Sequence, residues 1–511
     1  MNPPEVRIRS AGWLPGLADQ DLDGWHTLAF DGMMLRLPRL RPDGLARLIE
    51  RLVGARDDYL ARLPVDRVVD LLDRVASRWL EPASAYRREA EALLPIVTGY
   101  AEPAIRKGLA SYLALLRREN LLRLLEAELP DPRVLDEFRP RGRAGGQTRA
   151  FGPRLAVHIW SGNVPGLPAQ SLVSALLVKA ASLGKVASQE PLFPTLLAES
   201  IAEVDPRLAE CLAVVFWPGG DERLEGVAFG AAEAVIAYGG ERAIDAIRGR
   251  VPPTARFIPY GHKLSFGAIG REALTTDRLE ATADQAAYDV SKYDQQGCLS
   301  PHLLYVESGG QTLPGAFAEA LAAALERYAG LVPRGRLGLE EAASVADLRQ
   351  QFELRQMTGA SVAIFGGNGW AVLFDGEDAS FSPSCLNRTV LVKPVGDLVQ
   401  DVPRLVVPVR RYLQTCGVAA APARRQALAE RLGPLGLDRV CPLGRMGDVA
   451  ATWHHDGRFN LLDLLRWTDL EPEATAGRWE FAHPDLGLYG THTEDERAWQ
   501  SPRPTPNGRP A

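Results

Sequence analysis

The sequence has little of what marks a membrane, secreted or metal-dependent protein. None of its apolar runs approaches the ~20 residues of a spanning helix, and the opening stretch MNPPEVRIRSAGWLPG has no apolar core of signal-peptide length. The five cysteines are scattered without CxxC spacing, which favours a reducing cytoplasm over a disulfide framework. His454 and His455 are adjacent, so their side chains diverge and predict no metal site. We therefore expect a cytoplasmic protein with no membrane span and no metal.

An excess of one charge is also missing. The 58 Lys and Arg residues against 64 Asp and Glu give a formal net charge of -6. This argues against nucleic acid as the main partner, because nucleic acids attract strongly basic surfaces. With 511 residues, 46% of them hydrophobic, the chain has enough apolar material for two or three domains of the usual ~100–200 residues.

The pattern of apolar residues changes near residue 150. Residues 1–150 contain long segments with apolar residues at helical spacing and predict a helical region that packs on the next domain. In residues 151–270 strand-like and helix-like segments alternate, which predicts a parallel sheet with ligands at the carboxyl ends of its strands. Residues 271–450 continue with α/β segments, and residues 451–511 form a C-terminal segment with a polar tail. The segments interpreted as strands are LAVHIW, GKVAS, LAVVFW, AVIAYG, ARFIPYG, LLYVE, SVAIFG, AVLFD, TVLVKPV and RLVVPV.

Cys298 lies in an unusual setting for a cysteine. Its polar neighbours, DQQG before it and SP shortly after it, form a loop between a predicted helix and a predicted strand. A free cysteine is more often part of a packed core than a nucleophile, yet this loop is a poor place to bury an apolar side chain. A single cysteine is a weak signal, so both readings stay open on these residues alone.

Asn163 lies in the turn SGNVPG that follows the predicted strand LAVHIW. The motif is compatible with a simple turn. At the carboxyl end of a parallel strand, however, an Asn side-chain amide can donate a hydrogen bond to a developing oxyanion. The sequence itself does not bring Asn163 and Cys298 together.

Three further loops at predicted strand ends suit a nucleotide. Lys185 can bond ribose hydroxyls or a phosphate on the ribose, although a solvated lysine is the simpler reading. Ser188 stands where a carboxylate would repel a 2′-phosphate, and it offers a donor instead. The other two loops are strand-to-helix turns that lack the GxGxxG pattern and are a weak indication of phosphate binding. Their glycines are Gly219, Gly220, Gly239 and Gly240.

Taken in order, these segments resemble the aldehyde dehydrogenase superfamily. Residues 163–165 are similar to its Asn-Phe-Pro turn, residues 185–192 (KVASQEPL) to its Lys-Pro-Ser-Glu-Gln-Thr-Pro-Leu cofactor segment, and residues 293–298 (YDQQGC) to its nucleophile loop. Within the superfamily, about residues 70–470 resemble the LuxC-type acyl-CoA reductases, the fatty-acid reductases of bacterial bioluminescence. The stretches that carry this likeness are HIWSGNVPG, QQGCLSPH, NRTVLVKPV, LQTCGVA and WHHDGRFNLLDLLRW.

Two departures from the superfamily pattern bear on function. Hydrolytic members carry Glu-Leu-Gly-Gly-Lys, whose glutamate activates water, whereas residues 259–263 read PYGHK. The Glu-x-Phe-Gly-Pro motif, whose glutamate binds the nicotinamide ribose, is replaced around residues 384–388, SCLNR. In addition, Ser188 stands where many NAD enzymes of this class have glutamate, which favours NADP(H).

The resemblance implies an α/β fold with two Rossmann-like parallel-sheet lobes and a helical N-terminal addition. Residues 151–270 would bind NADPH and residues 271–450 would carry the nucleophile. Cys298 would attack the thioester of an acyl-CoA or acyl-carrier protein, Asn163 would hold the oxyanion, and NADPH would reduce the S-acyl group to an aldehyde. A homo-oligomer and an acyl-protein synthetase partner are implied by the resemblance alone.

Two alternatives to this reading follow from the same residues. An oxidative NAD(P)-dependent aldehyde dehydrogenase would form acid from an aldehyde without CoA, and the missing glutamate argues against it. A non-catalytic acyl-binding scaffold would fail to bind NADPH, and the presence of both Asn163 and Cys298 argues against it.

Overall fold

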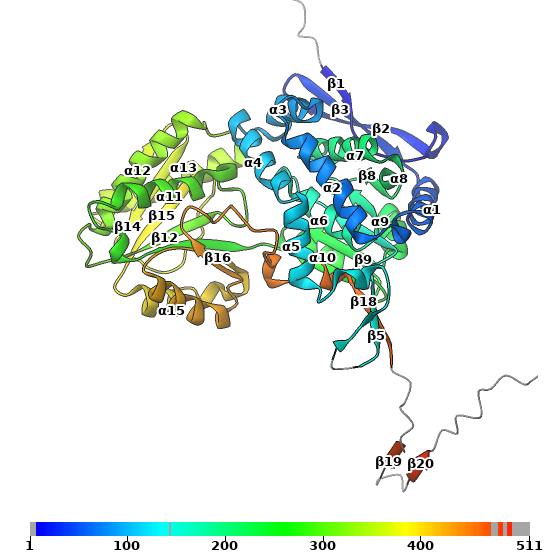
Figure 1. Cartoon of the computed structure of the whole chain (residues 1–511). Helices are drawn as coiled ribbons and strands as arrows, with labels where there is room; N and C mark the ends of the chain where they lie inside the picture. The colour runs from blue at the N-terminus through cyan, green and yellow to red at the C-terminus, as the bar shows by residue number, and fades with distance from the viewer. Residues whose placement is uncertain (1–6, 143–144, 472–478, 484–487, 493–511) are drawn as a thin grey trace, which may run out of the picture.

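Two sheets made mainly of parallel strands form two lobes that lie side by side (Figure 1). The computed structural model describes residues 7–142, 145–471, 479–483 and 488–492. A five-stranded sheet has the order β10-β9-β6-β7-β8, and a seven-stranded sheet has the order β13-β14-β15-β12-β11-β16-β17. The predicted α/β architecture with two Rossmann-like lobes is confirmed.

The five-stranded sheet is wholly parallel and is covered by helices on both faces. Burial on both faces explains the apolar runs of its strands. The strand β7 begins three residues before the expected segment GKVAS, because α6 ends at Leu177. The elements are β6 (Leu155–Ile159), α6 (Leu167–Leu177), β7 (Ala181–Lys185), α7 (Leu192–Val204), β8 (Leu212–Val215), α9 (Glu222–Ala231), β9 (Ala234–Tyr238), α10 (Glu241–Arg248) and β10 (Arg256–Tyr260).

The seven-stranded sheet contains one antiparallel pair, β13 with β14, and is otherwise parallel. Its interior strand β11 (Leu264–Ile269) was not predicted from the sequence. Because β11 pairs with β12 and β16, the boundary between the lobes falls after Tyr260 and not at residue 270. The other elements are α11 (Leu279–Ser291), β12 (Pro301–Glu307), α12 (Pro314–Leu331), α13 (Leu339–Met357), β13 (Val362–Gly367), β14 (Trp370–Asp375), β15 (Thr389–Val395), α14 (Leu398–Leu405), β16 (Leu413–Ala419), α15 (Pro422–Leu432) and β17 (Arg439–Pro442).

The segment RLVVPV, expected as a strand, is helical. Its first residues end α14, and its last ones begin a 3-10 helix over Val407–Tyr412. Pro403 precedes this stretch and Pro408 lies within it; neither has an N–H to donate to a sheet ladder, which excludes a central strand here.

The N-terminal region is only partly helical. A three-stranded sheet, β1 (Arg7–Ser10), β2 (Leu22–Phe30) and β3 (Met33–Leu40), precedes the first helix, so the helical region expected over residues 1–150 begins at Pro42. The alternate residues Met33, Leu35 and Leu37 are fully buried, which is the period-two pattern of a half-buried strand. The helices are α1 (Pro42–Asp58), α2 (Val65–Leu80), α3 (Ala85–Thr98), α4 (Glu102–Ala114) and α5 (Arg118–Glu128).

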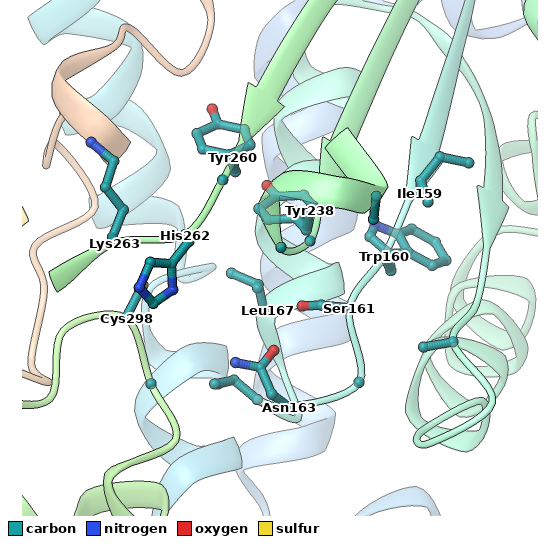
Figure 2. Close-up of a pocket in the computed structure, with 18 of the residues that line it drawn as sticks. Ile159, Trp160, Ser161, Asn163, Leu167, Tyr238, Tyr260, His262, Lys263 and Cys298 are labelled. Carbon is teal, nitrogen blue, oxygen red and sulfur yellow. The ribbon is translucent and has the colours of Figure 1, made fainter. Parts of the chain in front are cut away.

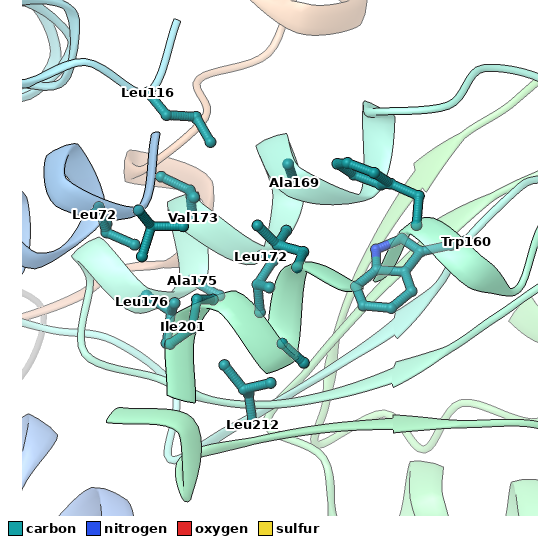
Figure 3. Close-up of a cluster of buried hydrophobic side chains, with 14 of the residues drawn as sticks. Leu72, Leu116, Trp160, Ala169, Leu172, Val173, Ala175, Leu176, Ile201 and Leu212 are labelled. Carbon is teal, nitrogen blue, oxygen red and sulfur yellow. The ribbon is translucent and has the colours of Figure 1, made fainter. Parts of the chain in front are cut away.

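These helices share a core with the five-stranded lobe. Figure 3 shows Leu72 of α2 next to Val173 of α6, and Leu172, Leu176, Ile201 and Leu212 belong to the same buried cluster. At the usual ~25 cal/mol per Å² of buried apolar surface, a core of this kind fixes the helices firmly on the lobe.

The chain returns to the first lobe at its C-terminal end. Strand β18 (Arg466–Leu470) pairs with β5 (Gln147–Phe151), which also pairs with β4 (Arg139–Pro140). The Glu128 carboxylate accepts hydrogen bonds from the backbone N–H groups of residues 460–462 and fastens this segment to α5. Strands β19 (Trp479–His483) and β20 (Leu488–His492) form a hairpin. The expected polar tail lies mostly outside the described residues. None of the helices in the described ranges has the length and apolarity needed to cross a membrane.

Candidate active site

A cavity of about 760 Å³ opens at the carboxyl ends of the strands of the five-stranded sheet (Figure 2). Residues at or just after the end of each strand line it: Ile159, Lys185, Gly219, Tyr238 and Tyr260. The opposite wall comes from the second lobe and includes Cys298. This position is the one that open parallel sheets use for ligands.

The loop that carries Cys298 is turned by three consecutive residues in the left-handed region. Tyr293, Asp294 and Gln295 have φ values of 48°, 51° and 68°. For residues other than glycine, this conformation costs about 1–2 kcal/mol each. The cost is offset by buried side-chain bonds, such as that from Gln295 Nε2 to the carbonyl of Pro301 at 2.7 Å. Strain held in this way is typical of functional loops.

A second left-handed run faces the first one. Leu386, Asn387 and Arg388 have φ values of 63°, 58° and 60°. Arg388 Nε donates to Asp294 Oδ1 at 2.7 Å, and Asn387 Oδ1 accepts from Gln296 Nε2 at 2.8 Å. Residues 384–388 are therefore hydrogen-bonded to the loop that carries Cys298. Of residues 384–388, only Leu386 lines the cavity.

Asn163 joins the two lobes at the cavity. The Asn163 Nδ2 donates to the backbone carbonyl of Gln296 at 3.0 Å. The backbone carbonyl of Asn163 accepts from the Tyr100 hydroxyl at 2.6 Å. A Cβ on the preceding Gly162 would lie 2.8 Å from the Cβ of Gln189, so only glycine allows this turn to approach the next one. The structure thus places Asn163 and Cys298 on the same cavity, with Gln296 between them in the bonding scheme.

The Cys298 thiol is held in its neutral form. Burial, together with the charge of Asp456, raises the pKa of Cys298 to about 12. A hydrogen bond from Gln414 and the charge of Lys263 oppose this effect and lower the pKa in part. In the ligand-free enzyme the thiol is protonated at neutral pH, so its reaction requires a group that takes its proton.

Three histidines also line the cavity: His262, His302 and His455. His302 Nδ1 accepts the backbone N–H of Ser384 at 3.2 Å, which places the proton of the neutral ring on Nε2. Burial lowers the pKa of His302 to about 4, so the ring is neutral at physiological pH. His262, in the stretch that lacks the glutamate, is exposed, and its ring lies 5.8 Å from that of Tyr412.

The residues predicted to bind the cofactor differ in whether they line the cavity and in whether they already bond within the protein. Lys185, Gly239 and Gly240 line the cavity, and burial lowers the pKa of Lys185. Gly219 and Gly220 line it too.

The Gly220 N–H donates to Glu225 at 3.0 Å and is therefore engaged within the protein. Ser188 is exposed and is not among the cavity-lining residues, whereas its neighbour Gln189 is.

Several site residues were missed by sequence reasoning. An aromatic stack forms one wall: Tyr238 and Tyr260 lie 4.7 Å apart, His455 lies 4.3 Å from Tyr260, and Trp453 lies 4.7 Å from His455. Asp456 also lines the cavity. The stretch WHHDGRF was noted for its likeness to a family, but no pattern in it predicts that it folds against β10. In the described part of the chain, no cluster of three or more His, Cys, Asp or Glu side chains is arranged to hold a metal ion.

Solved structures define the class of this fold. The aldehyde dehydrogenase KauB from Pseudomonas aeruginosa aligns with a TM-score of 0.72 at 14% identity, covering 91% of this chain and 96% of that one. Aldehyde dehydrogenase 21 from Physcomitrella patens aligns with a TM-score of 0.69 at 14% identity, covering 91% and 98%. The chain has the aldehyde dehydrogenase fold.

The family within that class follows from sequence similarity. The model of the acyl-CoA reductase (LuxC) family matches residues 60–467, and the chain belongs to this family of oxidoreductases. A protein named long-chain acyl-protein thioester reductase from Aliivibrio fischeri is 28% identical over 414 residues, covering 80% of this chain and 83% of that protein. Its namesake from Photorhabdus laumondii is 27% identical over 415 residues, with coverage of 80% and 83%.

Proposed function

We propose that this protein reduces a long-chain fatty acyl thioester to the aldehyde, with NADPH as reductant and Cys298 as the acylated nucleophile. The observation that carries the proposal is the meeting of Cys298 and Asn163 on one cavity at the sheet's carboxyl edge. The names of the curated relatives support the substrate class.

The chemistry of the first step uses groups of this chain alone. The Cys298 sulfur attacks the thioester carbonyl, and the thiol of the donor leaves. The Asn163 amide has two N–H groups. One donates to Gln296, and the other is free in the bonding scheme to donate to the oxyanion together with the Cys298 backbone N–H. One such donor is typically worth about 3–4 kcal/mol in the transition state.

The cavity fits a dinucleotide. The space beside Gly239 and Gly240, at the N-terminus of α10, is open except for Ala243. The Gly239 N–H already donates to the Tyr260 carbonyl at 3.1 Å, so the N–H of Gly240 is the one that would meet a pyrophosphate at this helix N-terminus. Lys185 would contact the adenosine ribose or its 2′-phosphate. When bound, NADPH supplies the hydride that reduces the S-acyl group. The chain's own residues hold the acyl carbon at Cys298 and release the aldehyde as the carbon–sulfur bond breaks.

The missing glutamate favours reduction over hydrolysis. The stretch Arg256–Tyr260 and the loop after it, which includes His262 and Lys263, bring no carboxylate to the cavity. Residues 384–388 bring none either. Without a carboxylate in the glutamate's place, water is poorly activated and the acyl enzyme persists until reduction.

The proposal covers three kinds of acyl donor. Acyl-CoA, acyl-carrier protein and an acyl group on a synthetase partner all present the same thioester. A homo-oligomer and such a synthetase partner remain part of the proposal by family likeness.

The test is a pair of reactions with purified protein. With NADPH and a long-chain acyl-CoA or acyl-carrier protein, we expect aldehyde and oxidised cofactor in equal amounts, and none with Cys298→Ala. With aldehyde and NADP⁺ but no CoA, we expect no acid. Acid formation would instead favour the oxidative dehydrogenase, and failure to bind NADPH would favour the scaffold.

A further inference from the structure

A buried carboxylate without a cationic partner faces the nucleophile's cavity. The Asp456 side chain is 7% exposed and lines the cavity that Cys298 also lines. Asp456 has φ 52° and ψ 36°, so the chain adopts the left-handed conformation to present it. Burying a carboxylate is costly unless it is paired, and such an arrangement marks functional sites more often than packing.

The cations near Asp456 are already engaged by other carboxylates. Lys263 Nζ lies 2.8 Å from Asp438 Oδ2, and Arg458 Nη2 lies 2.8 Å from Asp463 Oδ2. The nearest nitrogen that can carry charge is His455 Nε2, at 3.7 Å. Burial lowers the pKa of His455 to about 3, so this ring is neutral. Within the described residues, Asp456 therefore has no ion pair with Lys or Arg.

Gln414 lies near both the carboxylate and the cysteine. The Gln414 Nε2 group donates to Asp456 Oδ1 at 2.5 Å. Ser265 Oγ donates to the Cys298 carbonyl at 2.7 Å and accepts from the N–H of Thr415, next to Gln414, at 3.2 Å. Gln414 is fully buried at the start of β16, and its Oε1 has no partner among the described residues. These bonds hold Asp456 and Cys298 on the same side of the cavity that both line.

We infer that Asp456 is the proton acceptor for the Cys298 thiol and the proton donor to the departing thiolate. This inference rests on the proposed acyl transfer at Cys298. It assigns proton transfer between thiols, and no activation of water, to a carboxylate from the far end of the chain.

The step balances with groups already named. The Cys298 S–H bond breaks, the proton moves to the Asp456 carboxylate, and a bond forms between sulfur and the acyl carbon. The carbon–sulfur bond of the donor then breaks, and the Asp456 proton passes to the leaving thiolate. The acyl group has moved from the donor sulfur to Cys298, the proton has moved from Cys298 to the donor sulfur, and Asp456 is ionised again.

The electrostatics agree with this task. Burial raises the pKa of Asp456, which makes it a stronger base than an exposed aspartate. Lys263 and Arg458 oppose that rise in pKa, while the charge of Asp456 raises the pKa of the Cys298 thiol. The titratable groups that face Asp456 are Cys298, His455, Lys263, Arg458, Asp438, Tyr238 and Tyr260.

The Asp456→Asn variant tests the role of Asp456 because the rates of alkylation and acylation of Cys298 should change in opposite directions if Asp456 accepts the proton. Removing the charge lowers the pKa of the thiol, so alkylation of Cys298 by iodoacetamide at pH 8 becomes faster. If Asp456 accepts the proton, acylation by a long-chain acyl-CoA at pH 7 becomes about 10²–10⁴-fold slower. Both rates come from intact-protein mass spectrometry. Asp456→Glu restores part of the acylation, and Asp469→Asn, on the exposed strand β18, changes neither rate.

Acylation of Asp456→Asn at the wild-type rate or faster would overturn the inference and leave the proposed function intact. Should that variant not fold, the wild-type pH profile decides. A proton acceptor gives an acylation rate that levels off above the pKa of Asp456, whereas a tenfold rise per pH unit up to pH 10 contradicts it. No acylation of the wild type by acyl-CoA or acyl-carrier protein overturns the proposed function, and this inference with it.

Discussion

The side-chain amide of Asn163 donates a hydrogen bond to the carbonyl of Gln296, two residues before Cys298. Asn163 follows β6 of one lobe, and Gln296 precedes β12 of the other. One bond of 3.0 Å thus connects the Asn163 turn to the Cys298 loop. Because catalysis depends on such distances to about 1 Å, the bond would set the geometry of the proposed acyl transfer.

Replacing Asn163 tests this relationship. We expect Asn163→Ala to slow acylation by a long-chain acyl-CoA about 10²–10³-fold, because it removes an oxyanion donor. Gln170→Ala removes another amide from the cavity wall and serves as the matched control, with a change of less than about threefold expected. Acylation rates come from quenched-flow mass spectrometry. Equal rates for the two variants would exclude Asn163 from the oxyanion site.

The ion pair of Arg388 and Asp294 should be necessary for folding. Their side chains are only 1% and 6% exposed, so Arg388→Ala leaves an uncompensated charge in the core. We expect the free energy of unfolding to fall by about 3–5 kcal/mol. The exposed pair of Arg39 and Asp23, at 54% and 55%, is the control, and Arg39→Ala should cost less than about 1 kcal/mol. Urea denaturation measures both, and similar losses would contradict the burial argument.

Gly240 offers a test of cofactor binding that does not disturb the fold. No atom lies within 4 Å of a Cβ built on Gly240 or on Gly226, so both accept alanine in the ligand-free protein. If the pyrophosphate approaches the α10 N-terminus, Gly240→Ala should weaken NADPH binding roughly tenfold or more, or about 1.4 kcal/mol. Gly226→Ala, on α9, should bind normally. Fluorescence titration gives both affinities, and an unchanged affinity of Gly240→Ala would place the phosphates elsewhere.

The protonated thiol predicts a steep pH dependence. Because the pKa of Cys298 is about 12, only about one thiol in 10⁵ is ionised at pH 7. Alkylation of the ligand-free enzyme should therefore rise about tenfold per pH unit from pH 7 to pH 10. An ordinary thiol, with a pKa near 8.5, would level off by about pH 9. Peptide mapping identifies the label on Cys298, and a plateau below pH 9 would show that the thiol is activated at rest.

Much of the fold could be predicted from local sequence patterns, and each exception has a physical cause. The strands β6, β8 and β9 are apolar runs between turn residues, and they were placed to within a residue or two. The segment RLVVPV is also mainly apolar, but proline has no N–H to donate to a neighbouring strand, and the segment is helical. The strand β11, LSFGAI, carries no turn signal of its own, and only its pairing with β12 and β16 defines it.

The site was predictable where one short segment carries the chemistry. Cys298 and Asn163 stand in compact motifs, whereas Asp456 gains its significance only from the fold. Its neighbours Gln414 and Lys263 come from distant strands and loops, and no spacing rule connects them. Ser188 shows the converse, because its place in a familiar motif suggested a cavity contact that the structure gives to Gln189.

Intact-protein mass spectrometry is the most direct test of the central claim. The protein is mixed with a long-chain acyl-CoA or acyl-carrier protein, with and without NADPH, beside Cys298→Ala. We predict one acyl adduct on the wild type, none on the variant, and loss of the adduct with release of aldehyde when NADPH is added. An adduct that persists with NADPH, or one that forms equally on Cys298→Ala, would contradict reduction through an S-acyl cysteine.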